Sequence, residues 1–206
     1  NGTVTYVYDA SPHVTKRTDA KGQETRYTYD TYGRLTQVQH WALSWNAGTG
    51  SYQFQEQALQ RVDYYYDSNP LDGSYSQNSW GRLTAVTFKE ENQGSPFTYM
   101  YSYNQAGRVT AQWVQADSAG QIFNAADTWE TGGRMTTIDY GPKYQMQFDA
   151  NGRLSGMQDM ANGNATVASA SYGVAGEMAG LSYFGYNEAR TYNSMLQMTR
   201  MTVSGM

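Results

Sequence analysis

Near the start of the chain lie four residues of types that enzymes use: Tyr29, Asp30, Gly33 and Arg34. A tyrosyl hydroxyl, a carboxylate and a guanidinium placed together would suit a small catalytic cluster. The same residues would also suit the corner of a β-hairpin. An Asp at the first position of a type I turn caps the backbone, and a Gly at its end takes the positive φ that closes the hairpin. The spacing alone leaves both interpretations open.

The stretch that holds these residues, YDTYGRLT at 29–36, recurs along the chain. Close copies begin at residues 103, 129 and 148, and weaker ones begin at 8, 172 and 192. An eighth copy is split by an insertion, with YYYD ending at 67 and WGRLT resuming at 80. Most copies lie roughly 20–26 residues apart, a period typical of repeat proteins. The residues assigned to the repeat motif are Tyr8, Asp9, Tyr29, Asp30, Gly33, Arg34, Tyr66, Asp67, Gly81, Arg82, Tyr103, Asn104, Gly107, Arg108, Trp129, Gly133, Arg134, Phe148, Asp149, Gly152, Arg153, Tyr172, Gly176 and Tyr192.

Recurrence decides against a catalytic cluster, because a catalytic constellation is needed once and this one appears about eight times. The aromatic position also accepts Tyr, Trp and Phe, as at Tyr29, Trp129 and Phe148. A mechanism that uses a tyrosyl hydroxyl would not survive that exchange, whereas packing would. We therefore expect the aromatic rings to pack on neighbours one repeat away, and the arginines to pair with turn carboxylates or stack on rings. No catalytic residue is predicted, and the chain is not expected to be an enzyme.

The elements around each corner are predicted to be two short strands. Before the corner the sequence alternates with a period of two, as in YTY at 27–29, and after it comes a second strand-like run. Leu35 and Val38, like Leu83 and Val86, are apolar but three residues apart, which in a flat strand would place them on opposite faces. A bulge or strong bend after the corner would restore them to one face.

The predicted fold class is all-β: an array of antiparallel β-hairpin repeats that forms a curved, twisted spiral sheet. One domain is expected over residues 1–206, with non-repeated insertions near 41–60 and 68–79. Only 39% of residues are hydrophobic, while 21 glycines and 19 tyrosines are present, which agrees with turns and strands.

Charge and composition exclude several classes of function. The net charge is −4, with no basic cluster of the kind that nucleic-acid binding requires, so no nucleic-acid partner is predicted. There is no cysteine, which removes disulfides and thiolate metal sites. No apolar run approaches the ~18 residues of a transmembrane helix, so no membrane insertion is expected. The chain opens at Asn1 directly in strand-like sequence, which is typical of a piece of a longer polypeptide.

The remaining polar residues give no second constellation. His13 and His40 are far apart in sequence, and His13 occupies the arginine position of its repeat. Most carboxylates stand at turns, where hairpin chemistry accounts for them. GTGS at 48–51 lacks the lysine and helix of a phosphate-binding loop. No metal and no cofactor are predicted.

The segment at 41–60 is different because it is not repeated. It is predicted to form an extended hairpin in which Trp41, Trp45, Tyr52 and Phe54 flank a Gly-rich tip. Exposed rings there could stack on sugars, with Trp41, Trp45 and Tyr52 as the ligand-binding candidates. The alternative is that these rings pack against the adjacent hairpin. The sequence leaves both open.

The recurring YTYDxxGRLT resembles the YD repeat of the Rhs family, found in bacterial polymorphic toxins, insecticidal toxin complexes and animal teneurins. The resemblance extends over essentially the whole chain and is strongest at 27–36. It implies hairpins that wind into a hollow shell, which encloses a toxic C-terminal domain or, in teneurins, supports extracellular adhesion. The family's DPxG-type core with its aspartic self-cleaving site is absent from this sequence, so neither self-cleavage nor toxicity is expected of it.

From the resemblance we expect a non-catalytic structural segment of a large secreted or surface Rhs-type protein, located outside the cell or on its surface. Its partners would be the remaining repeats and an enclosed C-terminal domain of the same parent chain, and its raw sheet ends would favour end-to-end self-association. The alternative function is a carbohydrate or cell-surface binding module that uses exposed aromatics, with glycans as partners.

Overall fold

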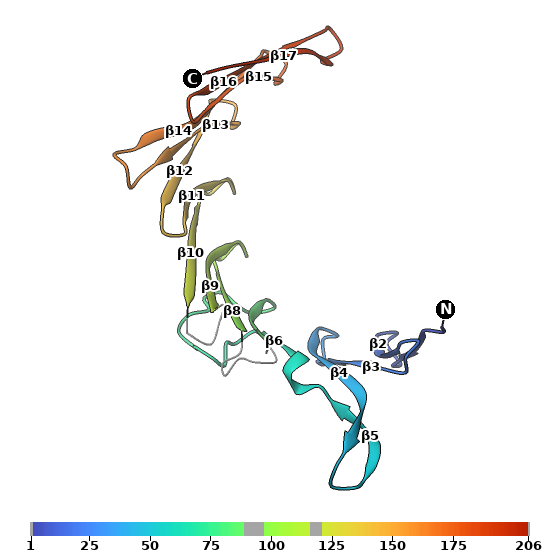
Figure 1. Cartoon of the computed structure of the whole chain (residues 1–206). Helices are drawn as coiled ribbons and strands as arrows, with labels where there is room; N and C mark the ends of the chain where they lie inside the picture. The colour runs from blue at the N-terminus through green and yellow to red at the C-terminus, as the bar shows by residue number, and fades with distance from the viewer. Residues whose placement is uncertain (1, 89–96, 116–120, 206) are drawn as a thin grey trace. The chain divides into compact units, whose positions relative to one another are not determined.

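The structure is a computed structural model that describes residues 2–88, 97–115 and 121–205 (Figure 1). The chain divides into two compact units, residues 1–123 and 124–206, and each is described by itself. The sequence DSAG at 117–120 predicts a turn that joins one hairpin to the next, and it lies outside the described residues. The described part contains no helix long and apolar enough to cross a bilayer.

The first unit is built from antiparallel strands that mostly pair with their sequence neighbours. Its elements are β1 (Thr5–Tyr8), β2 (Val14–Thr18), β3 (Glu24–Tyr29), β4 (Leu35–Asn46), β5 (Ser51–Glu56), the short 3-10 helix η1 (Ala58–Gln60), β6 (Val62–Tyr66), β7 (Leu83–Phe88), β8 (Phe97–Tyr103) and β9 (Val109–Gln115). The exception is β4, whose far part pairs with β5 over 41–46 while Gln37 and Val38 pair with β6.

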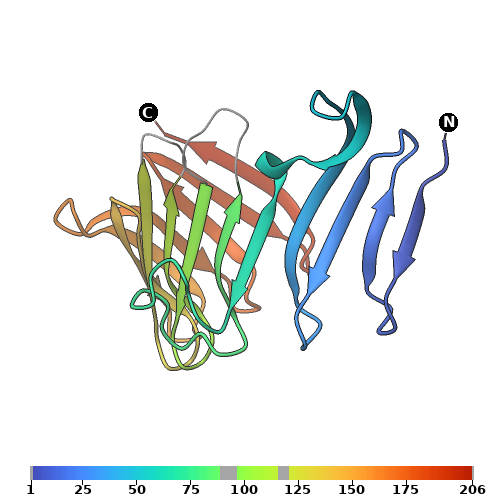
Figure 2. The same ribbon diagram turned by 90° about the horizontal axis from the view of Figure 1, so that it is seen from below.

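The second unit repeats the same arrangement without interruption. Its strands are β10 (Ile122–Trp129), which begins at the boundary, β11 (Met135–Asp139), β12 (Lys143–Phe148), β13 (Leu154–Asp159), β14 (Ala165–Tyr172), β15 (Met178–Tyr183), β16 (Tyr186–Tyr192) and β17 (Met198–Ser204). Each pairs in antiparallel fashion with the next, and the strands lie side by side in Figure 2. The predicted fold class, an all-β array of antiparallel hairpins, is confirmed.

A β-bulge follows every corner of the repeat. In the hairpin of β3 and β4, Tyr29 lies opposite Leu35 but Thr28 lies opposite Gln37, so Thr36 is left without a partner. The same shift occurs at the motif aromatic of all eight hairpins. It places Leu35 and Val38 on one face of the sheet, so the predicted bulge is confirmed. The residues left unpaired are Thr15, Thr36, Thr84, Thr110, Thr136, Ser155, Ala179 and Thr199.

Threonine suits the bulge position because its hydroxyl can bond to a backbone carbonyl on the opposite strand. The Thr36 hydroxyl donates to the carbonyl of Thr28 at 3.1 Å, and the Thr84 hydroxyl donates to that of Tyr65 at 3.0 Å. The side chain therefore supplies a hydrogen bond where the bulge interrupts the backbone ladder.

Burial in the described part is concentrated at β7 and β8. Ala85 and Thr84 are fully buried and Met100 is 6% exposed. The insertion at 68–79 is tied to this region, since the Tyr103 amide donates to the carbonyl of Gln77 at 3.1 Å. Most other strand residues are only half-buried, which is what a single-layer sheet produces.

Candidate functional site

The repeated corner is the feature that the sequence singles out, and its turn is closed as predicted. The Asp30 amide donates to the carbonyl of Arg34 at 2.9 Å, and the Gly33 amide donates to that of Asp30 at 3.0 Å. One carboxylate oxygen of Asp30 accepts the amides of Tyr32 and Arg34, both at 2.9 Å. Gly33 has φ +77°, a conformation that favours glycine.

The arginine of the Asp30 corner reaches the next repeat. Arg34 forms an ion pair with Asp30 of its own turn at 2.7 Å and a two-pronged pair with Asp67 of the next turn at 2.6 and 3.1 Å. Its guanidinium carbon also lies 4.5 Å from the centre of the Tyr66 ring. A planar guanidinium serves both purposes at once, because its donors lie in the plane and its face is free to stack.

The same forward stacking recurs at four further corners. The pairs are Arg82 on Tyr103 at 5.7 Å, Arg134 on Phe148 at 4.7 Å, Arg153 on Tyr172 at 4.4 Å, and the His13 ring on that of Tyr29 at 4.7 Å. The aromatics therefore do contact a neighbour one repeat away, but the neighbour is the cationic or imidazole side chain of the preceding corner. Among the described residues no two motif rings stack directly on each other.

The hydroxyls of four motif tyrosines point back to the preceding repeat. Each of these four donates to the carbonyl of the apolar residue that follows the arginine position there. The bonds are Tyr29 to Val14 at 2.9 Å, Tyr103 to Leu83 at 2.6 Å, Tyr172 to Leu154 at 2.8 Å and Tyr192 to Met178 at 2.8 Å. Successive hairpins are thus joined by a side-chain clamp in addition to their backbone ladder.

The electrostatics of the corners keep both partners ionised. Hydrogen bonds from Arg34 hold the pKa of the Asp67 carboxyl below its usual range, and the backbone amide of Arg153 does the same for the pKa of Asp149. The bond to Asp67 in turn raises the pKa of Arg34. Carboxylates with lowered pKa values are weak bases, so these groups are suited to holding the turn rather than to proton transfer.

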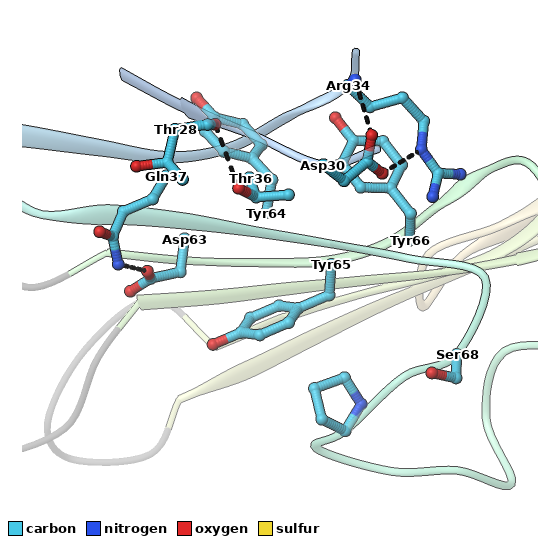
Figure 3. A pocket seen from close by; sticks show the side chains of 11 residues that line it. Thr28, Asp30, Arg34, Thr36, Gln37, Asp63, Tyr64, Tyr65, Tyr66 and Ser68 are labelled. Atoms are coloured by element: carbon cyan, nitrogen blue, oxygen red, sulfur yellow. Dashed lines mark hydrogen bonds and ion pairs between the residues drawn. The ribbon is translucent and has the colours of Figure 1, made fainter. Parts of the chain in front are cut away.

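A pocket of about 510 Å³ opens beside the Asp30 corner (Figure 3). It lies where β4 pairs with β6 at only two positions, so the rest of the two strands is not joined by backbone pairing. The Asp30–Arg34 pair lies at one end, and at the other the Gln37 amide donates to Asp63 at 2.6 Å. Each carboxylate that lines the pocket is bonded to a neighbouring side chain, Asp30 to Arg34 and Asp63 to Gln37. The described residues also include no group of three or more histidine and acidic side chains that could hold a metal.

The three candidate ligand residues of the 41–60 segment are placed differently from one another. Trp41 is half-buried with the Arg26 guanidinium 4.1 Å above its ring, and its buried indole N–H has no hydrogen-bond partner. Trp45 and Tyr52 are opposite each other on β4 and β5 and are 57% and 67% exposed. Phe54 lies on the same face of the hairpin. Sugar binding here stays a prediction.

A family model of known proteins matches the part of the chain that holds the first two corners. Residues 8–42, which hold the first two corners, match the family model described as RHS Repeat. These residues carry an RHS repeat.

One solved structure supports the fold of the chain as a whole. The crystal structure of TcdB2-TccC3-TEV is similar with a TM-score of 0.72 and 14% identity, over 98% of this chain and 10% of that one. The crystal structure of TcdB2-TccC3-Cdc42 and the Photorhabdus luminescens Tc holotoxin pore with the TccC3-D651A mutation match with TM-scores of 0.43 and 0.40. Their identities are 15% and 13%, over 96% of this chain and 14% and 13% of theirs. No curated protein matches the sequence.

Two contacts of the RHS repeat escaped the reasoning from sequence. The threonine at the bulge recurs in the motif GRLT, but its hydrogen bond across the hairpin depends on the strand register. That register cannot be determined from the sequence. The backward bond of the tyrosyl hydroxyl is not predicted from the sequence, because Trp129 and Phe148 replace tyrosine at the same position. In the structure four tyrosines make this bond, while at Phe148 the ring lies under Arg134 without one.

Proposed function

We propose that the chain is part of the wall of a shell built from RHS repeats, within a larger secreted or surface polypeptide. The wall encloses or presents another domain of that polypeptide and performs no catalysis itself. The observation that carries this proposal is that the motif side chains serve structural contacts. Asp, Gly, Arg and aromatic side chains at the described corners are engaged in turn closure or in contacts between repeats.

The similarity to the TcdB2-TccC3-TEV structure supports the fold that such a wall requires. This chain spans only 10% of that structure's length, so a wall segment would depend on neighbouring repeats to close a shell. A continuous sheet of clamped hairpins suits that role, because each repeat is stabilised mainly by the repeats beside it.

Protease protection of the full-length gene product tests the proposal. Tyr172→Ala removes a ring that Arg153 covers and a hydroxyl bonded to Leu154, whereas Val174→Ser changes a fully exposed side chain in the same corner. We expect the enclosed domain to resist trypsin in the wild type and in Val174→Ser, and to be cleaved in Tyr172→Ala. A domain that is cut equally fast in all three would refute the shell.

The second candidate function, glycan binding, rests on the exposure of Trp45 and Tyr52. A glycan array probed with this chain tests it, because a wall segment alone should retain no glycan. Binding that disappears in Trp45→Ala would support the glycan candidate.

A further inference from the structure

The hairpin of β4 and β5 extends beyond the repeats of the first unit (Figures 1 and 2). Its strands pair over six positions, from Trp41 opposite Glu56 to Asn46 opposite Ser51, and residues 47–50 form the turn at the tip. We call residues 42–55 the tip hairpin. The contacts between the repeated corners, as described above, do not involve the tip hairpin.

The tip hairpin is amphipathic with the period of a strand. One face carries Leu43 opposite Phe54 and Trp45 opposite Tyr52. These side chains are 60%, 39%, 57% and 67% exposed, so four large apolar groups meet solvent together. The other face carries alanine, serine and glutamine side chains.

The tip hairpin contains no Asp, Glu, Lys, Arg or His over its whole length. The nearest charges lie at its base, where Arg61 is paired with Glu56 at 2.6 Å. Its polar side chains are also bonded internally, since the Asn46 amide donates to Gln53 at 2.9 Å. An uncharged surface of this kind complements a neutral, weakly polar partner.

Two other occupants fit the geometry less well. A sugar-binding platform needs a flat ring face beside free polar groups, but the Trp45 and Tyr52 rings meet edge to face at 72° with 5.3 Å between centres. A second copy of the chain would need about 800 Å² from each partner for a stable interface. At the observed exposures, the four side chains offer about 100 Å² each, or about 400 Å² together.

We propose that the tip hairpin is a membrane-contact element that places Leu43, Trp45, Tyr52 and Phe54 in the interface of an electrically neutral bilayer. Trp and Tyr prefer the level of the lipid headgroups, where the ring is in an apolar layer and its polar atom remains wet. Insertion is shallow, because the outer edge of β5 has unpaired backbone groups that must keep contact with water. This contact lies beyond the wall function and differs from a transmembrane helix, of which the described residues contain none.

Flotation with phosphatidylcholine vesicles tests the proposal with the intact chain. We expect the wild type to float with the vesicles, and the double variant Trp45→Ser/Tyr52→Ser to lose at least about tenfold in partition coefficient as apolar area is removed. Trp80→Ser is the matched control, because Trp80 is 77% exposed outside the tip hairpin and its loss should leave flotation unchanged. Since the tip has no basic residue, added phosphatidylserine should not strengthen binding.

The fold of each variant is checked by hydrogen exchange at β8 and β9, which should be unchanged because the tip is remote from them in sequence and pairing. A brominated lipid should quench tryptophan fluorescence in the wild type, and quenching should fall in Trp45→Phe. Equal flotation of wild type and double variant would overturn the proposal. So would flotation that requires a glycolipid, or self-association that the double variant abolishes without any vesicle binding.

Discussion

The backward bond of the motif tyrosine allows a paired test of the clamp between repeats. Tyr103→Phe deletes the hydroxyl that bonds to the Leu83 carbonyl at 2.6 Å but keeps the ring that Arg82 covers. Phe148→Tyr adds a hydroxyl at a corner where the ring already lies under Arg134. By the geometry of the other corners, the new hydroxyl would face the carbonyl of Met135.

The expected magnitudes follow from hydrogen-bond energetics. A neutral hydrogen bond contributes about 1 kcal/mol net, so Tyr103→Phe should lower the free energy of local opening by about that amount. Phe148→Tyr should raise it by up to about 1 kcal/mol for the same reason. Tyr103→Ala also removes a half-buried ring and should cost about 3 kcal/mol, the low end for loss of an aromatic side chain.

Hydrogen exchange is the appropriate assay, because a repeat array with two units need not unfold in one step. Protection should fall at the amides of β8 and β9 in Tyr103→Phe and rise at those of β12 and β13 in Phe148→Tyr. If neither variant changes protection, the hydroxyl contributes nothing to the clamp. If Tyr103→Phe costs as much as Tyr103→Ala, the ring contributes nothing and the stacking argument fails.

Three further predictions concern the bulge and the pH dependence. Thr84→Val should lower stability by about 1–3 kcal/mol in urea unfolding, because the buried hydroxyl donates to two backbone carbonyls, and equal stability would show that the bulge needs no hydroxyl. The pKa values of Asp67 and Asp149 are lower in the folded chain than the unfolded value of 3.8, so their ionised forms stabilise the fold at pH values above 3.8. Stability should therefore fall as pH drops below about 4, and a flat acid profile would contradict these ion pairs. Burial raises the pKa of Tyr75 to about 12 and also raises the pKa of Tyr101, so stability should fall as pH rises above about 10, and spectrophotometric titration should show late-ionising tyrosines.

The corner was predictable from the sequence because its chemistry is local. Asp30 caps amides two and four residues away, and Gly33 supplies the positive φ within the same turn. The bulge was predictable for the same reason, since the three-residue spacing of Leu35 and Val38 conflicts with a flat strand. Each inference needed only neighbouring residues and the known geometry of turns.

The contacts between repeats were not predictable to the same degree. Arg34 bonds to Asp30 of its own turn and also to Asp67, which is 33 positions away. Whether it can reach Asp67 depends on how far the next hairpin is offset along the sheet. That offset is set by pairing across the insertion, where Gln37 and Val38 alone join β4 to β6. The pocket beside Asp30 has the same origin, so no local pattern indicates it.

The contacts give the array a direction. Five of the described corners send a cation or imidazole forward onto the next ring, and four motif tyrosines bond backward to the previous carbonyl, as at Arg153, Tyr172 and Leu154. The two faces of a repeat are therefore different, and only the head-to-tail order satisfies both. This explains how the aromatic position tolerates Trp and Phe. Such a residue loses one backward bond but still offers a ring to the arginine behind it, so the chain can vary the residue at one corner without breaking the order of the array.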